Sequence, residues 1–402
     1  MVTMYYQYFI VFALAIIVIN FIINNIMFKN IKNFKLPESI LKSPPLVSVL
    51  IPARNEEKNI RKILNSMIKQ DYPNLEILVL DDSSTDATGQ IVQEFTEKDK
   101  RVRLIKGEPL PQGWKGKCFA CHQLSKLAKG EYFVFTDADT LHYPNSISGS
   151  LAALVKNKLD VTSIYPRQIA VTFSERMTIR FIHFAILSFM PLILVKYTKG
   201  PFFSTAIGQF FLFKRKVYEK IGGFESVKDE ILEDINISKQ VKRCGFKIMV
   251  YDGSDSIFCR MFTNLPDVIK GFSRYIYAAF DCNFLMEAIA IFFISLIFMV
   301  PFILLPLGIF IFDWSARMIT LCIIQILLIF FIKIVCAIRF KERILDVFFT
   351  PISVAYIALL AVNSFFHSRF GKGVNWKDRT YGAFTENGLG SIEDKSEKHS
   401  IH

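Results

Sequence analysis

A long uncharged apolar segment opens this chain, and further apolar segments fill its last third. The first runs from Tyr5 to Phe28, which is long enough to cross a bilayer as a helix. It is too long for a signal-peptide core and lacks a basic start and a small-residue cleavage site, so we expect a retained anchor within residues 1–30. Three more candidate spans lie at Phe284–Phe312, Ile319–Ile338 and Leu345–Phe366. The sequence therefore predicts a membrane protein with a soluble insert.

Basic residues predict the side of the membrane on which this insert lies. Lys29, Lys32, Lys35 and Lys42 follow the first apolar segment, and nothing basic precedes it. By the positive-inside rule the insert is expected to be cytoplasmic. The formal net charge of +12 then reflects cytoplasmic flanks and attraction to anionic lipid rather than nucleic-acid binding, because no basic stripe with interleaved aromatics is present.

The C-terminal topology stays open at this stage. Three spans after a cytoplasmic insert would put the tail outside, yet the basic residues from Arg369 to Arg379 argue for a tail inside. One segment must then be interfacial, re-entrant or a hairpin, and the candidates are Phe284–Phe312 and Leu345–Phe366, which both contain proline. We expect membrane helices over residues 284–366 and a basic, then disordered, tail over 367–402.

The insert, residues 45–280, alternates short β-branched strands with helical segments. Strands are expected at residues 47–51, 76–80, 103–105 and 132–135, and helices at Glu57 to Gln70 and Ser83 to Lys98, the latter opened by Ser84 and Asp86 as caps. This alternation predicts an α/β fold with a mostly parallel, doubly wound sheet. Residues 180–196 are apolar but short for a span, which favours an interfacial or core helix.

Four acidic motifs follow predicted strands or open a helix. They are P-A-R-N-E-E at residues 52–57, D-D-S-S-T-D at 81–86, D-A-D at 137–139, and E-D at 233–234. The carboxyl edge of such a sheet is where ligands bind. Alone, each motif has a plain structural reading: a turn after a strand for Asp137 and Asp139, or helix capping for Asp82, Glu233 and Asp234.

Taken together, the acidic motifs suit transfer of a group from a diphosphate. Mg²⁺ or Mn²⁺ favours one or two carboxylates plus phosphate oxygens, which Asp139 can supply. Displacement at an anomeric carbon also needs a base for the incoming hydroxyl, a role open to Asp234 beside Glu233. Lys115 and Lys117 can neutralise the departing diphosphate.

At this point the chain resembles the family 2 glycosyltransferases, inverting enzymes of the GT-A fold, over about Pro45 to Tyr277. The resemblance implies that Pro52, Ala53 and Glu56 line the uracil and ribose pocket and that Asp82 contacts the base. It further implies that Asp137 lies near the ribose, that Asp139 binds the metal and that Asp234 is the general base. Gly208 and Gln209 either form the small-residue acceptor loop that the family has there or a strand with a basic edge.

A closer resemblance is to bacterial transferases that glycosylate apolar lipids, the carotenoid (diaponeurosporenoate-type) and hopanoid-associated members. It rests on G-W-K-G-K at residues 113–117, on the order of the apolar segments, and on a tail containing Trp376 and Arg379. That tail looks like a W-K-G-R-x-Y ending with Asp378 in place of glycine. Processive synthases of the family carry Q-x-x-R-W, of which only Arg274 remains here, as a diphosphate or acceptor contact, so a single transfer is favoured over polymer synthesis.

The seven cysteines suggest no disulfide framework and fit a reducing cytosol. Cys118, Cys121 and His122 form C-x-x-C-H, the haem c attachment pattern, but that chemistry belongs to an exported compartment, so a buried helix face is the preferred reading. The sequence thus predicts an enzyme using a nucleotide sugar, a lipid acceptor and Mg²⁺ or Mn²⁺ at the cytoplasmic face of the cell membrane. Alternatives are a polysaccharide synthase, a ceramide or diacylglycerol transferase and, remotely, a membrane haem protein.

Overall fold

The computed structural model describes residues 2–370 and, beyond them, only the backbone of five short strands between residues 374 and 394; side chains are described from residue 4 to residue 370. The chain divides into two compact units. The sheet unit comprises residues 28–169, 192–261 and 375–402, and the apolar-helix unit comprises residues 1–27, 170–191 and 262–374.

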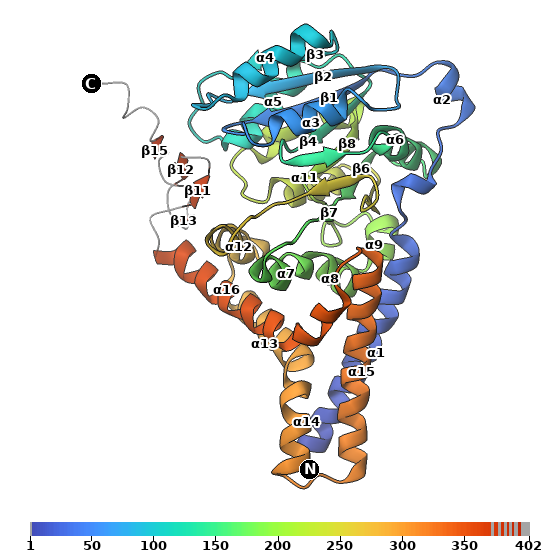
Figure 1. Ribbon diagram of the computed structural model, residues 1–402, viewed down its shortest axis with the longest axis vertical. Helices are drawn as coiled ribbons and strands as arrows, with labels where there is room; N and C mark the ends of the chain where they lie inside the picture. The colour runs from blue at the N-terminus through green and yellow to red at the C-terminus, as the bar shows by residue number, and fades with distance from the viewer. Residues whose placement is uncertain are drawn as a thin grey trace. The chain divides into compact units, whose positions relative to one another are not determined.

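The sheet unit is built on a seven-stranded sheet of order β3-β2-β1-β4-β8-β6-β9, with a second sheet of order β5-β10-β7 (Figure 1). Its strands are β1 Val47–Ala53, β2 Leu75–Asp81, β3 Val102–Lys106, β4 Tyr132–Thr136, β5 Thr140–His142, β6 Val161–Tyr165, β7 Arg167–Gln168, β8 Phe210–Lys214, β9 Ile248–Asp252 and β10 Ile257–Cys259. The small strands β11 Val374–Trp376, β12 Arg379–Tyr381, β13 Phe384–Thr385, β14 Gly388–Leu389 and β15 Glu393–Asp394 complete the list.

The large sheet is mixed rather than purely parallel. Strands β1 to β4 pair in parallel, as do β6 and β9, but β8 runs antiparallel between β4 and β6. The apolar run of β8 did not reveal this, because a strand buried on both faces reads the same in either direction. An α/β fold was correctly predicted, and the mixed direction refines it.

Helices connect these strands and cover the sheet. They are η1 Ile31–Asn33, α2 Glu38–Lys42, α3 Ile60–Met67, α4 Thr88–Lys98, α5 Gly116–Leu127, α6 Ser146–Lys156, α9 Leu192–Tyr197, α10 Arg215–Lys220, η2 Gly223–Val227 and α11 Glu233–Arg243.

Two helices begin later than the sequence suggested. Helix α3 begins at Ile60 instead of Glu57, and α4 begins at Thr88 instead of Ser83. Ser83 adopts a left-handed backbone with φ of 54°, which a helix cannot contain. Asp86 does act at the start of α4, since its Oδ1 accepts the Thr88 N–H at 3.0 Å. The polar residues between strand and helix are therefore free to form a loop at the sheet edge.

An aromatic cluster fills the core beneath the end of β4. Phe133, Phe135 and Phe213 are buried on β4 and β8, and Tyr218 and Phe224 pack against them with ring centroids 4.9–6.2 Å apart. Each such side chain contributes about 1.5–3 kcal/mol by leaving water. The cluster fixes the position of the strand ends that carry the acidic motifs.

The apolar-helix unit contains three helices that are long and apolar enough to cross a membrane, at Met4–Met27, Ala316–Arg339 and Ile344–Phe370. Within it α1 and α15 run side by side (Figure 1), and buried Gln325 on α15 donates to Gln7 on α1 at 2.5 Å. Such polar contacts join helices in an apolar setting. Its elements are α1 Val2–Met27, α7 Phe173–Thr178, α8 Arg180–Phe189, α12 Leu265–Ala279, α13 Phe284–Phe298, α14 Val300–Phe310, α15 Ala316–Arg339, η3 Ile344–Phe349 and α16 Thr350–Phe370.

Two predicted helices are broken in the structure, each beside a proline. The expected span Phe284–Phe312 is divided into α13 and α14 at Met299, next to Pro301, and α12 and α13 form a pair bent by 110°. The expected helix at residues 180–196 is divided into α8 and α9 at Pro191, and these belong to different units. Proline lacks the N–H that a continuous helix requires, which accounts for both breaks.

Candidate functional site

The site begins where two neighbouring strands meet the same edge of the large sheet. Strand β4 ends at Thr136, and Thr136 is paired with Phe210, the first residue of antiparallel β8. The residue that follows β4 and the residues that precede β8 therefore lie next to each other. This register brings Asp137 to the loop that contains Gly208 and Gln209. An antiparallel neighbour is required for this arrangement, because a parallel one would place its start at the opposite edge.

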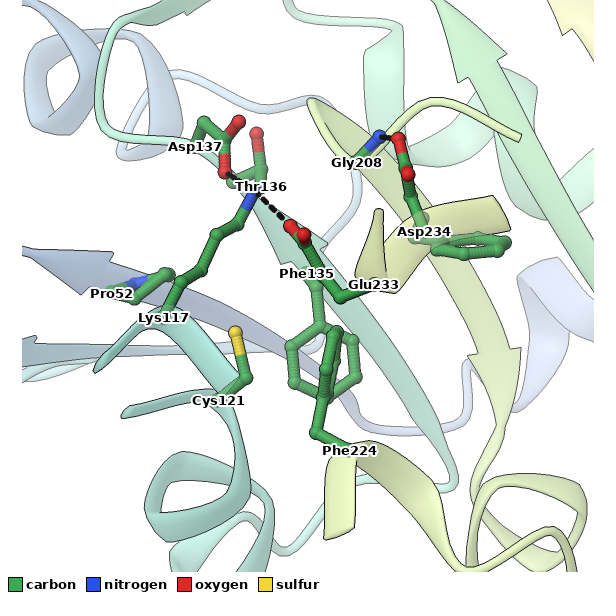
Figure 2. A pocket seen from close by; sticks show the side chains of 11 residues that line it. Pro52, Lys117, Cys121, Phe135, Thr136, Asp137, Gly208, Phe224, Glu233 and Asp234 are labelled. Atoms are coloured by element: carbon green, nitrogen blue, oxygen red, sulfur yellow. Dashed lines mark hydrogen bonds and ion pairs between the residues drawn. The ribbon is translucent and has the colours of Figure 1, made fainter. Parts of the chain in front are cut away.

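The first turns of two helices supply the remaining charged groups. Lys117 lies in the first turn of α5, and Glu233 and Asp234 are the first two residues of α11. The Lys117 Nζ lies 2.7 Å from Asp137 Oδ1 and 3.0 Å from Glu233 Oε1. Figure 2 shows its ammonium directed between these two carboxylates. Three chain segments far apart in sequence are thus joined by one lysine.

Asp234 is held by the backbone of the loop that contains Gly208. Its Oδ2 accepts the N–H of Gly208 at 2.9 Å (Figure 2), and its Oδ1 accepts the N–H of Ile235 at 2.8 Å. Burial, together with the charge of Glu233, raises the pKa of Asp234 to about 7, although Lys117 and the two N–H groups act in the opposite direction. A carboxylate with a pKa near neutrality is well matched to accepting a proton from a hydroxyl group.

Lys117 forms ion pairs with two carboxylates, those of Asp137 and Glu233. Burial disfavours the charged ammonium, but Asp137 and Glu233 raise the pKa of Lys117 well above its usual value. The pKa of Asp137 is also raised, because burial outweighs its attraction to Lys117. Lys117 therefore stays protonated at neutral pH, while the carboxylates compete for one cation.

These groups line a pocket of about 280 Å³ with an apolar floor. Pro52 of β1 and Phe211 of β8 also line it, and Phe135, Phe224 and Cys121 lie in the lower part of the view in Figure 2. Cys118 and Cys121 are buried on α5, and burial raises the pKa of both thiols. The C-x-x-C-H segment thus serves as a packed helix face next to the site, as the sequence analysis preferred.

Asp139 lies in the turn after β4, not in the strand, so the strand's alternation does not place it on one face with Asp137. Asp139, Asp137 and Glu56 all act electrostatically on the thiol of Cys259, whose pKa burial and these charges raise. Among residues 4–370, no group of three or more His, Cys, Asp or Glu side chains is arranged as a ready metal site. A donor-bound Mg²⁺ or Mn²⁺ requires only one or two carboxylates besides phosphate oxygens, and the hard-oxygen donors of Asp139 and Asp137 fit that need.

The other predicted donor-side residues lie at the ends of β1 and β2. Ala53 is buried, and its carbonyl accepts the N–H of Asp82 at 2.8 Å. The Asp82 carbonyl accepts a bond from Arg54 Nη1 at 2.8 Å. Glu56 is half-buried; its side chain accepts a bond from Asn59 at 2.8 Å, and its backbone N–H donates to the Thr88 hydroxyl at 2.8 Å. The two strand ends are therefore tied into one loop system.

Some predicted residues do not join this pocket. Gln209 is buried and accepts from Gln168 at 2.6 Å, while its Nε2 donates to the Cys259 Sγ at 3.0 Å, so it supports the loop. Arg274 lies on α12 in the apolar-helix unit. Trp376 and Arg379 lie in β11 and β12, and their side chains are outside the described residues.

A buried polar network under the D-A-D turn was missed by sequence reasoning. His142 Nε2 lies 2.8 Å from the Thr140 hydroxyl and 3.1 Å from the Thr136 hydroxyl, and Thr140 donates to the Asp137 carbonyl at 2.7 Å. Burial lowers the pKa of His142 to about 3, so the ring is neutral. The available signal was a run of polar residues flanking the acidic pair in an otherwise apolar region. The network positions the turn that carries Asp137 and Asp139.

The chain is similar to known glycosyltransferases. Residues 48–222 match the model of the family described as Glycosyl transferase family 2. The chain is 29% identical to "Probable glycosyltransferase YdaM" of Bacillus subtilis over 52% of this chain and 50% of that protein. It is 24% identical to a 4,4'-diaponeurosporenoate glycosyltransferase of Staphylococcus haemolyticus over 57% of this chain and 60% of that one. The matches thus span about half of these relatives' length.

A likeness to a solved structure is also found. A mannosyltransferase from Pyrobaculum calidifontis, solved in complex with GDP-Man and Mn²⁺, superposes with a TM-score of 0.47 at 18% identity, covering 88% of this chain and 97% of that one. The strand-end motifs at residues 52–57, 81–86 and 137–139 all fall inside the matched segment 48–222. The family-model match identifies residues 48–222 as a glycosyltransferase family 2 segment.

Proposed function

We propose that this chain transfers a single sugar, with inversion, from a nucleotide sugar to an apolar lipid acceptor at the cytoplasmic face of a membrane. A UDP-linked donor is favoured by the resemblance of the strand-end motifs. The observation that carries the proposal is Asp234, a half-buried carboxylate with a pKa near 7 that lies in one pocket with Asp137, Glu233 and Lys117.

The proposed chemistry assigns Asp234 as the base. Its carboxylate takes the proton of the acceptor hydroxyl, the hydroxyl oxygen forms a bond to the anomeric carbon, and the bond from that carbon to the diphosphate oxygen breaks. The Gly208 N–H donates to one oxygen of the Asp234 carboxylate, and the Ile235 N–H in the first turn of α11 donates to the other. These two bonds fix the orientation of the carboxylate. Positioned bases of this kind contribute about 10²–10⁴-fold to a rate.

The departing diphosphate needs charge neutralisation at the opposite end of the pocket. Asp139 and Asp137 would hold a donor-bound Mg²⁺ or Mn²⁺, which supplies charge stabilisation on the diphosphate. Lys117 holds Asp137 and Glu233 in place through its two ion pairs. Pro52, Ala53, Glu56 and Asp82 would line the nucleoside side. We also propose that Arg274 contacts the diphosphate or the acceptor.

An apolar acceptor at the membrane is supported by the composition of the chain and by one relative. Three helices have the length and hydropathy of membrane spans, and up to four if the bent pair α12–α13 counts as one. The cluster Lys29, Lys32, Lys35 and Lys42 after α1 supports a cytoplasmic sheet unit. The relative in Staphylococcus haemolyticus is named for a carotenoid substrate, which supports a carotenoid or hopanoid-type acceptor here.

The test is incorporation of sugar into lipid by the full chain in native membranes. Membranes are incubated with individual UDP-sugars and a total lipid extract, and the new products are identified by mass spectrometry. We expect one product heavier than its acceptor by one sugar. A ladder of added sugars would instead identify a processive synthase, and products built on ceramide or diacylglycerol would reassign the acceptor.

A matched pair of variants ties the activity to the site. Asp234→Asn removes the proposed base, and Asp229→Asn makes the same chemical change at an exposed carboxylate five residues earlier. We expect Asp234→Asn to abolish transfer while UDP-sugar binding stays, and Asp229→Asn to be fully active. Loss of donor binding in Asp234→Asn would refute the assignment of Asp234 as base.

A further inference from the structure

A second pocket lies inside the apolar-helix unit, and none of the residues assigned above to the transfer reaction lines it. It holds about 310 Å³ of space between its side chains, open solvent at its mouth included. Four basic side chains and two carboxylates line it, which leaves an excess of two positive charges. They are Arg176, Arg180, Lys333, Arg343, Glu342 and Asp346.

The two carboxylates are already engaged by arginines. Asp346 forms ion pairs with Arg176, at 3.1 Å, and with Arg180. Arg180 also lies 3.8 Å from Glu342. These side chains are largely buried, with Asp346 exposed by 8% and Arg180 by 11%. The acidic groups therefore fix the arginines and do not neutralise the rest of the pocket.

Lys333 supplies the unbalanced charge. It lies on α15 within the segment Ala316–Arg339, which has the length and hydropathy of a membrane span. Its ammonium rests 4.6 Å from the ring centre of Phe184, and no carboxylate within the described residues 4–370 is in ion-pair contact with it. A charged side chain in such a helix is costly, so it usually marks a functional group or a partner.

The location of Lys333 suits a group at the membrane surface. It lies six residues before the end of α15 at Arg339, roughly 9 Å along the helix axis. Lys341 and Arg343 follow in the connection to η3. Basic pockets between membrane helices near such a basic flank bind anionic head groups.

We propose that this pocket binds a phosphate group, with Lys333 and Arg343 as its cationic contacts and the Arg176–Asp346–Arg180 ion pairs as its rigid wall. A phosphate oxygen cluster supplies the negative charge that the two lining carboxylates leave unmatched. The hydroxyls of Thr350 and Ser353, which also line the pocket, are committed to the backbone carbonyls of Val347 and Met177, so charge carries the recognition. The group belongs to an anionic phospholipid or is free phosphate, which the experiment separates.

The test measures lipid retention by the purified full chain. The chain in neutral detergent is mixed with dioleoylphosphatidylglycerol or with dioleoylglycerol, which lacks the phosphate, and bound lipid is read by native mass spectrometry. We expect retention of the phosphatidylglycerol alone. Lys333→Met should lower it by about tenfold, the effect of losing one charge-assisted bond, and Lys333→Arg should restore it.

Two further variants keep the result interpretable. Arg317→Met removes an exposed charge from the other end of α15 and should leave retention unchanged. Arg343→Met removes an exposed lining charge and should lower retention even if Lys333→Met does not fold. Equal retention by Lys333→Met, Arg343→Met and Arg317→Met would overturn the proposal.

Inorganic phosphate distinguishes the two sources. If excess sodium phosphate displaces the lipid and raises the thermal midpoint of the full chain but not of Lys333→Met, the pocket takes free phosphate. If it leaves lipid retention unchanged, the pocket takes the lipid head group. Absence of both lipid retention and a phosphate effect would refute an anion site. Sugar transfer is not measured in any arm, so failure here leaves the proposed function untouched.

Discussion

The substitution Gly208→Ala tests whether the Lys117 bridge matters for turnover, because it adds one methyl group at a defined place. A Cβ at residue 208 would lie 3.1 Å from Lys117 Nζ and 3.6 Å from both Asp234 Cβ and Glu233 Oε1. Gly208 is not among the described glycines with positive φ, so the backbone can hold alanine without strain. The N–H that Asp234 accepts is retained. The change therefore acts on the lysine and not on the base.

The size of the effect follows from these distances. Lys117 must retreat by a few tenths of an ångström, which stretches its contact with Glu233 from 3.0 Å toward the limit of a hydrogen bond. Losing about half of a charge-assisted bond costs about 1 kcal/mol, or about fivefold in kcat/KM. The lysine end is flexible, and Gly→Ala reduces the entropy of the unfolded chain, so the stability should change by less than about 1 kcal/mol.

The assay compares sugar transfer with thermal unfolding in membranes or detergent. Gly200→Ala is the matched control, because a Cβ at residue 200 would have no atom within 4 Å. We expect Gly208→Ala to lose about fivefold in kcat/KM with an unchanged unfolding midpoint, and Gly200→Ala to match the parent chain. Equal activity of the two variants would show that Lys117 need not sit between Asp137 and Glu233. A large loss of stability in Gly208→Ala would contradict the packing argument.

Three further changes probe the same site. As the proposed base, Asp234 would work only when deprotonated, and burial raises its pKa to about 7; kcat should therefore fall about tenfold per pH unit below pH 7 and level off above it, and a pH-independent rate from 5 to 8 would contradict the assignment. Excess chelator should stop turnover, Mn²⁺ or Mg²⁺ should restore it, and Asp139→Asn should raise the metal concentration needed for half-maximal rate; full activity in chelator removes that role of Asp139. His142→Ala should lower the free energy of unfolding by about 2–4 kcal/mol in denaturant titration, since it opens a cavity and strips buried hydroxyls of a partner, and an unchanged midpoint would refute the network's structural role.

The sequence predicted where the strands end, but it did not predict which strand ends lie next to each other. Apolar runs ending in P-A-R-N-E-E and D-D-S-S-T-D predicted β1 and β2, because a buried strand must stop where polar residues accumulate. The antiparallel course of β8 left no such mark, since Phe210–Lys214 is apolar throughout except at its end. That direction is what brings Asp137 next to the loop that precedes β8, where its N–H donates to the Gln209 carbonyl, so the layout of the site depends on a property without a local signal.

Side-chain partners were harder still to foresee. Lys117 could be read as a free cation for a diphosphate, but in the structure it holds Asp137 and Glu233. Sequence spacing does not place α5 and α11 against the same strand end, because their relation depends on how both pack on the aromatic core around Phe135 and Phe224. The membrane segments show the reverse case: length and hydropathy were strong local signals, and only prolines such as Pro301 decided where a predicted span was broken.

The charge balance of the pocket explains why a cation should accompany the donor. Within the described residues, Lys117 forms ion pairs with Asp137 and Glu233, and Asp234 lies beside Glu233 in the chain; burial, with the charge of Glu233 added, raises the pKa values of Asp137 and Asp234 although Lys117 lowers them. A diphosphate would bring further negative charge to a half-buried site of low effective dielectric, where like charges a few ångströms apart repel by several kcal/mol. Under the proposed function we therefore expect a divalent ion to arrive with the diphosphate, and we propose that Asp139, in the same turn as Asp137, receives it. The acidic excess that would make this pocket a poor phosphate site by itself is therefore what suits it to a metal-bound nucleotide sugar.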